Sequence, residues 1–531
     1  MLAAVVLLLV VLVRARLSGT PLERDEGEYA YAGQLILHGV PPYQLAYNMK
    51  FPGAYYAYAT IMAVFGQTAS GIRWGLILVN AATALLVFAI GRRLFGRFAG
   101  AIAAAAFALL SMDRWIMGVF AHATHFALLP ALAGLLLLLE APARRRALWI
   151  LFAGALLGLA VLVKQHAVAF VPLGALVIAG SDGGMRRDAR RTLLEIGLLA
   201  AGAALPFALL CAVLASQGVL GKFWFWTFAS ARAYVGEVPF SAFLPNLAAG
   251  FAKVTQVTAP LWLAGGAGLI ALWAGRWGRL EKMSLTALLV ASFVAVCPGF
   301  YFREHYFILM LPAVALLDGL AFAAAARLME RRLPSDLAQV AAAAAFLGLI
   351  VVVIVGQRDF LFRASPRELS RERYGRNPFI ESVTIADYIR RHTAPEDRIA
   401  VLGSEPQIYF YAGRRSATGY IYMYPLVEPQ RFATRMQDEM IHEVESAHPR
   451  YVVLVQITTS WLPRTTAIQR IVAWANAYTG RCYDLVGITD IVSRDETRYA
   501  WDEQVTGYQP QSKDLVFVFR RKSDAPCLAD R

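Results

Sequence analysis

The sequence predicts an α-helical polytopic membrane protein with about eleven transmembrane helices, followed by a C-terminal α/β domain. Two observations on composition predict this class: 58% of the 531 residues are hydrophobic, and only 17% are charged. A soluble domain usually carries about 25% charged residues. A third observation is that long apolar runs recur through the first two thirds of the chain. Such runs are expected where lipid, rather than water, surrounds the helices.

The apolar runs are expected to form a membrane domain over residues 1–356. A helix needs about 20 mostly apolar residues to cross about 30 Å of hydrocarbon. The expected spans are residues 2–17, 74–91, 98–112, 120–139, 147–163, 167–180, 193–215, 257–275, 284–300, 306–325 and 338–356. The pair at 147–163 and 167–180 is short enough for partial insertion. Residues 52–65 are short and rich in tyrosine, so we expect a juxtamembrane helix there.

The basic residues orient the chain. A net charge of +14 would suggest nucleic-acid binding in a soluble protein, but here the cations cluster in short loops between apolar runs, which disfavours that function. The positive-inside rule therefore predicts a cytoplasmic N-terminus and an extracytoplasmic C-terminal tail in an inner (plasma) membrane. The clusters are Arg92, Arg93 and Arg97; Arg144 to Arg146; Arg186, Arg187, Arg190 and Arg191; Arg276, Arg279 and Lys282; and Arg327, Arg331 and Arg332.

The tail, residues 357–531, is expected to form an extracytoplasmic α/β domain, because two kinds of pattern alternate in it. Strand-like runs are residues 398–403, 451–456, 483–489 and 515–521, and helix-like stretches are residues 378–392, 428–447 and 463–478. Four cysteines are too few for a disulfide framework. Cys482 and Cys527 could pair outside the cytoplasm.

A cluster of acids follows the first span, inside an external loop expected over residues 19–73. It consists of Glu23, Asp25, Glu26 and Glu28. One interpretation is a solvated loop that caps a helix. The other is a functional site, because ionisable groups at a membrane are costly to keep there.

The motifs after this cluster resemble the first external loop of family 39-like enzymes in the GT-C superfamily, which includes protein O-mannosyltransferases and lipid A aminoarabinose transferases. The matching motifs, in order, are Asp25-Glu26, Tyr29-Ala30, Gly39 to Tyr43 and Lys50-Phe51-Pro52-Gly53. Phe51 departs from the family, in which a proline is usual. The likeness continues at Asp113 and at Arg303 to Phe307, whereas His125 stands where related sequences often have glutamate.

The resemblance implies a GT-C glycosyltransferase of the inverting kind that moves a sugar from a polyprenyl-phosphate lipid to a glycan, lipid or protein of the cell envelope. It assigns the base to Asp25, which would take the proton of the acceptor hydroxyl. Fixed cations would stabilise the departing phosphate. The expected substrate-binding residues are Glu26, Tyr43, Lys50, Asp113, Lys164, His166, Arg303, His305 and Tyr306.

Several of these residues have a structural alternative. Lys50 could extend along the membrane edge, and Tyr306 could belong to the aromatic belt. Arg303 could pair with Glu304. Asp113 could pair with the adjacent arginine, and Lys164 could occupy a tight outer hairpin.

No cofactor is required by the resemblance, no metal ligand is assigned, and a carboxylate-bound Mg²⁺ or Mn²⁺ remains open. His122 and His125 could share a metal, but spacing gives no third ligand. The sequence has no phosphate-binding glycine motif for a nucleotide. Two other functions stay open: a metal-dependent oligosaccharyl transferase that uses a pyrophosphate carrier, and a transporter or flippase, although no inverted repeat is obvious.

Overall fold

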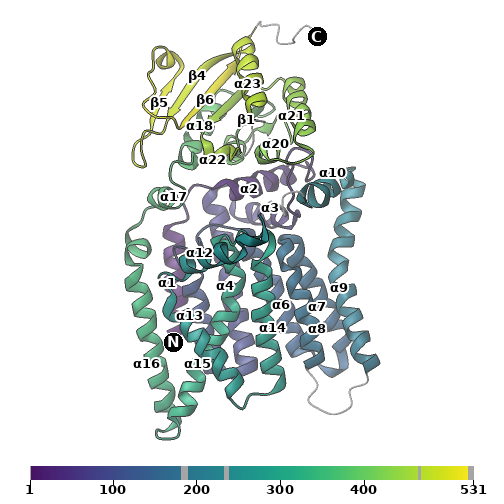
Figure 1. Cartoon of the computed structure of the whole chain (residues 1–531), viewed down its shortest axis with the longest axis vertical. Coiled ribbons are helices and arrows are strands. Elements are labelled where there is room, and N and C mark those ends of the chain that lie inside the picture. The colour runs from purple at the N-terminus through teal and green to yellow at the C-terminus, as the bar shows by residue number, and fades with distance from the viewer. Residues whose placement is uncertain (1, 181–188, 233–237, 464–467, 524–531) are drawn as a thin grey trace.

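The structure is a computed structural model that describes residues 2–180, 189–232, 238–463 and 468–523. Figure 1 shows a body of upright helices with a small sheet domain at one end. The turn between α15 and α16 lies at the opposite end of that body.

Each of the eleven expected spans is helical in the structure. The helices are α1 (Leu2–Arg16), α4 (Ala69–Phe95), α5 (Arg97–Leu110), α6 (Ala123–Glu140), α7 (Arg146–Val163), α8 (Phe170–Gly180), α9 (Ala189–Ser216), α13 (Ala259–Ala274), α14 (Arg279–Val296), α15 (Leu311–Met329) and α16 (Ser335–Gly356). Within the described part of the chain, six helices are long and apolar enough to cross a membrane, or seven if the pair Phe240–Thr255 and Ala259–Ala274, bent by 110°, is one span. The fold is that of a multi-pass membrane protein, while the count of eleven spans stays a prediction.

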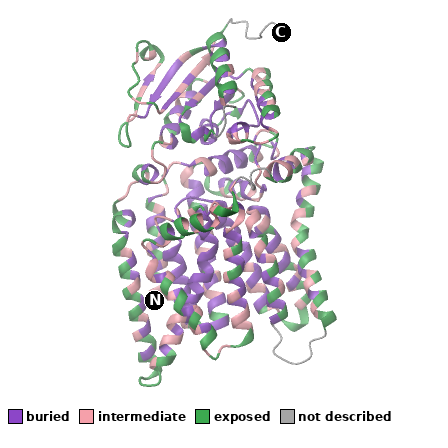
Figure 2. Cartoon of the chain, in the orientation of Figure 1, coloured by how far each residue is buried: buried purple, intermediate pink, exposed green. Residues whose placement is uncertain are grey.

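The outer helices expose apolar side chains. On α16, Leu337, Val340 and Val351 are exposed, whereas Phe346 and Ile350 are buried against the bundle. Figure 2 shows the same division, with exposed outer faces on α9 and α16 and a buried centre. Such faces are stable when lipid covers them, which agrees with the membrane class.

Short helices lie at the end of the bundle nearest the sheet (Figure 1). They are α2 (Arg24–Leu37), α3 (Gly53–Phe65), α10 (Leu220–Trp224), η3 (Phe225–Ser230), η4 (Phe240–Ala242) and α12 (Phe243–Thr255). A capping box between Glu23 and Glu26 starts α2. At 13 residues, α3 is about 20 Å long and too short to cross a bilayer, which agrees with the expected juxtamembrane helix.

The C-terminal sheet has six strands in the order β2-β1-β3-β6-β4-β5. The strands are β1 (Arg398–Leu402), β2 (Arg415–Ser416), β3 (Tyr451–Gln456), β4 (Tyr483–Asp490), β5 (Arg498–Trp501) and β6 (Leu515–Arg521). β1 runs parallel to β2 and β3, and the pairs β3–β6, β6–β4 and β4–β5 are antiparallel.

The helices of the C-terminal region are α17 (Pro366–Tyr374), α18 (Phe379–Arg391), α19 (Gln407–Ala412), α20 (Tyr424–Val427), α21 (Ala433–Ala447), α22 (Thr458–Trp461) and α23 (Ile468–Cys482). The remaining short helices are η1 (Ala143–Arg145), η2 (Gln165–Ala169), η5 (Pro298–Phe300), η6 (Glu304–Met310), η7 (Asp359–Arg363) and η8 (Asp502–Val505).

All four expected strands are present, but two short ones, β2 and β5, were not predicted. With two and four residues, they are too short to show an alternating pattern. The helix expected at 428–447 begins only at Ala433. Cys482 is buried. Cys527 and residues 464–467 lie outside the described residues, so the pairing of Cys482 with Cys527 stays a prediction.

The C-terminal region docks directly on α2. Helix α19 packs against α2, and the approach is so close that a Cβ at Gly27 would lie 2.7 Å from the Gln407 Cβ. The rings of Tyr31 and Tyr409 stack with centroids 5.1 Å apart. The first turn of α2 is therefore held between the helical bundle and the C-terminal region.

Candidate active site

The acids at the start of α2 have different partners, because successive helical residues point in different directions. Glu26 is fully buried. Its Oε2 accepts from Arg73 Nη2 at 2.8 Å, and its Oε1 accepts the Ala121 N–H. Glu26 thus ties the first loop to α4 and to the segment before α6.

Asp25 has a more open environment, with 23% of its side chain exposed. Its Oδ1 accepts from Lys50 Nζ at 2.9 Å and from the Tyr422 hydroxyl at 2.8 Å. Among the described residues, none donates to Oδ2. Burial alone would raise the pKa of Asp25, but the Lys50 ammonium outweighs it and holds this pKa well below its usual range. Asp25 is therefore a carboxylate with one oxygen left for another group.

Lys50 joins two acids of α2. Its Nζ lies 2.9 Å from Asp25 Oδ1 and 2.6 Å from Glu28 Oε2. Burial would lower the pKa of Lys50, but the two carboxylates raise it well above its usual range. The Tyr55 hydroxyl donates to Glu28, and the Tyr43 hydroxyl donates to the Lys50 carbonyl at 2.7 Å. Tyr43 thus shapes the Lys50 loop from a buried position.

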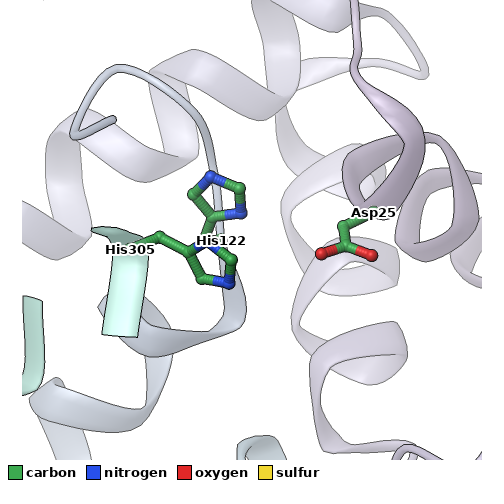
Figure 3. A group of neighbouring side chains, drawn as sticks. All are labelled: Asp25, His122 and His305. Atoms are coloured by element: carbon green, nitrogen blue, oxygen red, sulfur yellow. The ribbon is translucent and has the colours of Figure 1, made fainter. Parts of the chain in front are cut away.

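A pair of histidines faces Asp25 (Figure 3). His122, just before α6, stacks on His305 of η6 with ring centroids 4.2 Å apart. One potential ligand atom from each of Asp25, His122 and His305 lies within 4.8 Å of the others. Both nitrogens of His122 are buried, and neither has a hydrogen-bond partner among the described residues.

This group could hold a metal ion, since two imidazoles and one carboxylate are a common ligand set for Zn²⁺. Among the described residues, His125 does not belong to this group. The partner of His122 is instead His305, which lies 183 positions further along the chain by subtraction of the residue numbers. Only the packing of η6 against α6 brings these rings together.

Lys164 is a second cation near Asp25 and Lys50. Lys164 Nζ lies 4.9 Å from the centre of the Tyr306 ring, and the His166 ring also lies 4.9 Å from it. Within the described ranges, no acidic side chain forms an ion pair with Lys164. Burial, and then the Lys50 ammonium, lower the pKa of Lys164 to about 8. Arg303 lies over the Tyr301 ring at 5.3 Å, while Glu304 pairs with Lys253 and not with Arg303.

The structure does not bring Asp113 to this site. Asp113 is buried, and its Oδ1 accepts the N–H groups of Trp115 at 2.6 Å and Ile116 at 3.1 Å. Burial raises the pKa of Asp113 to about 6. The expected pairing with Arg114 is also absent, because Arg114 pairs with Glu372. Asp113 therefore closes a turn in the loop before α6.

Sequence reasoning assigned no individual role to three contributors: Glu28, which it named only as part of the acid cluster, Tyr55 and Tyr422. Glu28 lies three residues after Asp25, a spacing that places both on one helix face and could have signalled a shared partner. Nothing in the sequence signals Tyr422, which lies 397 positions from its partner Asp25.

An apolar groove of about 380 Å³ lies between α7, α8 and α9. Its lining includes Leu162, two positions before Lys164, and Val168 and Phe207. Val168 is exposed to the surroundings of the bundle. The groove could therefore accept a hydrocarbon chain from the side.

The sequence was compared with protein-family models and with curated proteins. A family model described as dolichyl-phosphate-mannose-protein mannosyltransferase matches residues 49–209, which include Lys50 and Lys164 but not Asp25. A search of curated proteins gives no match.

Solved structures share the fold. ArnT from Cupriavidus metallidurans, bound to undecaprenyl phosphate, is 18% identical with a TM-score of 0.60, over 98% of this chain and 97% of that chain. AglB from Archaeoglobus fulgidus, in complex with an inhibitory peptide and a dolichol-phosphate, is 15% identical with a TM-score of 0.52, over 94% and 74%. The A. fulgidus oligosaccharyltransferase in complex with Zn and sulfate is 15% identical with a TM-score of 0.54, over 95% and 73%.

These structures show the fold that the chain shares with them. The family match begins inside the first external loop, at residue 49, and covers less than half of the chain. Both comparisons agree with the resemblance stated from the first loop: the chain is similar in fold to ArnT and AglB, and over residues 49–209 it is similar to dolichyl-phosphate-mannose-protein mannosyltransferases.

Proposed function

We propose that this protein transfers a sugar from a polyprenyl-phosphate carrier to a hydroxyl of a glycan, lipid or protein in the cell envelope, with Asp25 as the base. One observation carries the proposal. A carboxylate with an open oxygen, Asp25, and a partly buried ammonium without an acidic partner among the described residues, Lys164, belong to one site at the end of a membrane bundle. The Asp25 carboxylate can take the proton of an acceptor hydroxyl, and the Lys164 ammonium can bind the phosphate of the donor.

The reaction would proceed as a single displacement. The acceptor hydroxyl gives its proton to Asp25 Oδ2 while its oxygen bonds to the anomeric carbon. The bond from that carbon to the phosphate oxygen breaks, and its electron pair leaves with the phosphate. Lys50 has three N–H donors and uses two on Asp25 and Glu28, so one remains for the phosphate. Lys164 and Arg303 supply further charge, and attack opposite the leaving group inverts the anomeric centre.

The proposal places residues 1–356 in an inner (plasma) membrane as the catalytic domain, with eleven spans, and residues 357–531 outside the cytoplasm. The arrangement in Figure 1 supports this orientation, because the basic turn between α15 and α16 lies at the end away from the sheet. The site would then face the extracytoplasmic side.

The apolar groove supports a lipid-linked donor. Its lining residues Leu162 and Val168 flank Lys164 in the chain, so a carrier tail in the groove could bring its phosphate toward that ammonium. The ArnT structure contains undecaprenyl phosphate and an AglB structure contains a dolichol-phosphate, so carriers of this class occur in proteins of this fold.

A second candidate, a metal-dependent oligosaccharyl transferase with a pyrophosphate carrier, is favoured by the group Asp25, His122 and His305. A bound divalent ion would act there as a Lewis acid. Against it, Lys50 Nζ lies 2.9 Å from Asp25 Oδ1 and would repel a cation. Dialysis against EDTA separates the two: a monophosphate-dependent enzyme retains its activity, and a metal-dependent one loses it until Mg²⁺, Mn²⁺ or Zn²⁺ is returned.

Asp25→Asn tests the proposal. The assay gives purified protein a panel of synthetic polyprenyl-phosphate sugars, with a crude cell-envelope fraction as the acceptor. We expect the variant to lose transfer by about 1000-fold, the scale of a general base, while still binding undecaprenyl phosphate in a thermal-shift assay. Undiminished transfer by Asp25→Asn would remove Asp25 from the mechanism, and lipid movement without transfer by the wild type would favour a flippase.

A further inference from the structure

A tyrosine of the C-terminal region reaches the first turn of α2. The Tyr422 hydroxyl lies 2.8 Å from Asp25 Oδ1, and its ring lies 5.4 Å from Lys50 Nζ. Only 8% of Tyr422 is exposed, so water does not compete freely for this hydrogen bond.

The backbone around Tyr422 is fixed within the C-terminal region. The N–H of Met423 donates to Ser404 Oγ at 2.9 Å, and the Tyr420 hydroxyl donates to Glu439 Oε2 at 2.9 Å. The ring of Tyr420 also packs edge-on against Tyr47 of the first loop, with centroids 5.1 Å apart. Tyr422 is thus presented to Asp25 from a rigid support.

The C-terminal region also contacts residues on either side of Asp25. Arg24 pairs with Glu405 at 2.6 Å, and Gly27 is in close contact with Gln407. These contacts fix the helix turn, while Tyr422 fixes the carboxylate itself. Since Tyr422 and Lys50 both use Oδ1, the rotation of the carboxyl group is restrained and Oδ2 is left for the acceptor.

We propose that Tyr422 is a positioning residue, through which the C-terminal region orients Asp25 Oδ2 toward the acceptor hydroxyl. This inference rests on the proposed role of Asp25 as the base. It gives the C-terminal region a direct part in transfer: a bundle without it would retain Lys50 but lack the second donor to Oδ1.

Tyr422→Phe tests the inference, because it removes one hydroxyl and keeps the ring. We expect kcat for transfer from the synthetic donor to fall about ten-fold, the scale of one hydrogen bond to a charged group. The KM for the donor should stay within two-fold, since Tyr422 would act on the base and not on the carrier.

Tyr420→Phe is the matched control, because its hydrogen bond stays inside the C-terminal region. We expect it to lower the melting temperature with little change in kcat. If Tyr422→Phe leaves kcat unchanged, or lowers kcat only in step with the melting temperature as destabilised protein would, the inference is wrong.

Asp25→Asn distinguishes failure of the proposed base, Asp25, from failure of the proposed positioning role of Tyr422. An active Asp25→Asn enzyme would overturn the role of the base, whatever Tyr422→Phe does. An inactive Asp25→Asn enzyme together with a fully active Tyr422→Phe enzyme would overturn only the positioning role.

Discussion

Asp25 and Asp113 both follow a membrane helix of the bundle, yet their surroundings differ. Asp25 is held by two side chains, Lys50 and Tyr422, and keeps one oxygen open. Asp113 is held by two backbone N–H groups of its own turn, and it is almost wholly buried. An acid at a helix end is therefore a candidate for chemistry when distant side chains hold it, and a turn-former when its own backbone does.

Substitution of Lys50 should cause the largest loss of sugar transfer after substitution of Asp25. In Lys50→Met the carboxylates of Asp25 and Glu28 lose their shared cation, and the phosphate loses a donor. We expect transfer to fall about 1000-fold, with a lower melting temperature because the buried Glu28 and the partly exposed Asp25 are left without their shared counter-ion. Initial rates and thermal unfolding in detergent measure both.

Lys222→Met is the control for this prediction. Lys222 also contacts a tyrosine of the first loop: its Nζ lies 4.5 Å from the centre of the Tyr47 ring, and it forms no ion pair with Asp25. We expect its transfer rate to stay within about three-fold of the wild type. Equal losses in the two variants would show that any lysine on this surface matters, and that Lys50 has no special role.

Glu26 extends the comparison of Asp25 with Asp113 to a neighbouring residue of the same helix turn. It is adjacent to Asp25, but its carboxylate forms a buried ion pair with Arg73. Glu26→Gln breaks a buried ion pair with Arg73 and leaves that guanidinium uncompensated. We expect a loss of about 3–5 kcal/mol in stability, and a fall in transfer that follows the loss of folded protein. A stable variant without activity would instead place Glu26 in the chemistry.

Asp113 should give the smallest effect on transfer. In Asp113→Asn the amide oxygen still accepts from Trp115 and Ile116, so we expect rates within about three-fold of the wild type. Burial raises the pKa of Asp113 from 3.8 to about 6 in the folded state. The folded protein therefore holds this proton more tightly than the unfolded chain, and wild-type stability falls as the pH rises from about 4 to 6.

The stability of Asp113→Asn does not depend on this titration. The difference in melting temperature between the variant and the wild type should therefore shift in favour of the variant as the pH rises from about 4 to 6, and should stay at that value at pH 7. Thermal unfolding at pH 4.5, 6 and 7.5 measures it. A gain that does not change with pH, or a transfer loss comparable to that of Lys50→Met, would contradict the assignment of Asp113 to a turn.

Much of the fold was predictable because it depends on local patterns. The eleven apolar runs became helices, and the four longer strands of the sheet lie where alternation indicated them. The strands β2 and β5 were missed, since their pairing depends on neighbours and not on their own few residues.

The site was predictable only in part. Asp25 and Lys50 were both predicted as site residues because motifs of one external loop contain them. Their ion pair was not predicted, and His122 and Tyr422 approach Asp25 from distant segments. Asp113, expected near the base, lies in its own turn.

By itself, the sequence determined that the chain crosses a membrane, that an α/β region follows, and that acids and a lysine lie in one short external loop. Hydrophobic transfer and helix periodicity are local properties, so residues in order suffice to show them. Only the tertiary structure decided which acid keeps an open oxygen, which histidines face it, and that a tyrosine from the C-terminal region completes its surroundings. Those choices depend on packing between segments hundreds of residues apart, where small differences in position decide which groups can form hydrogen bonds.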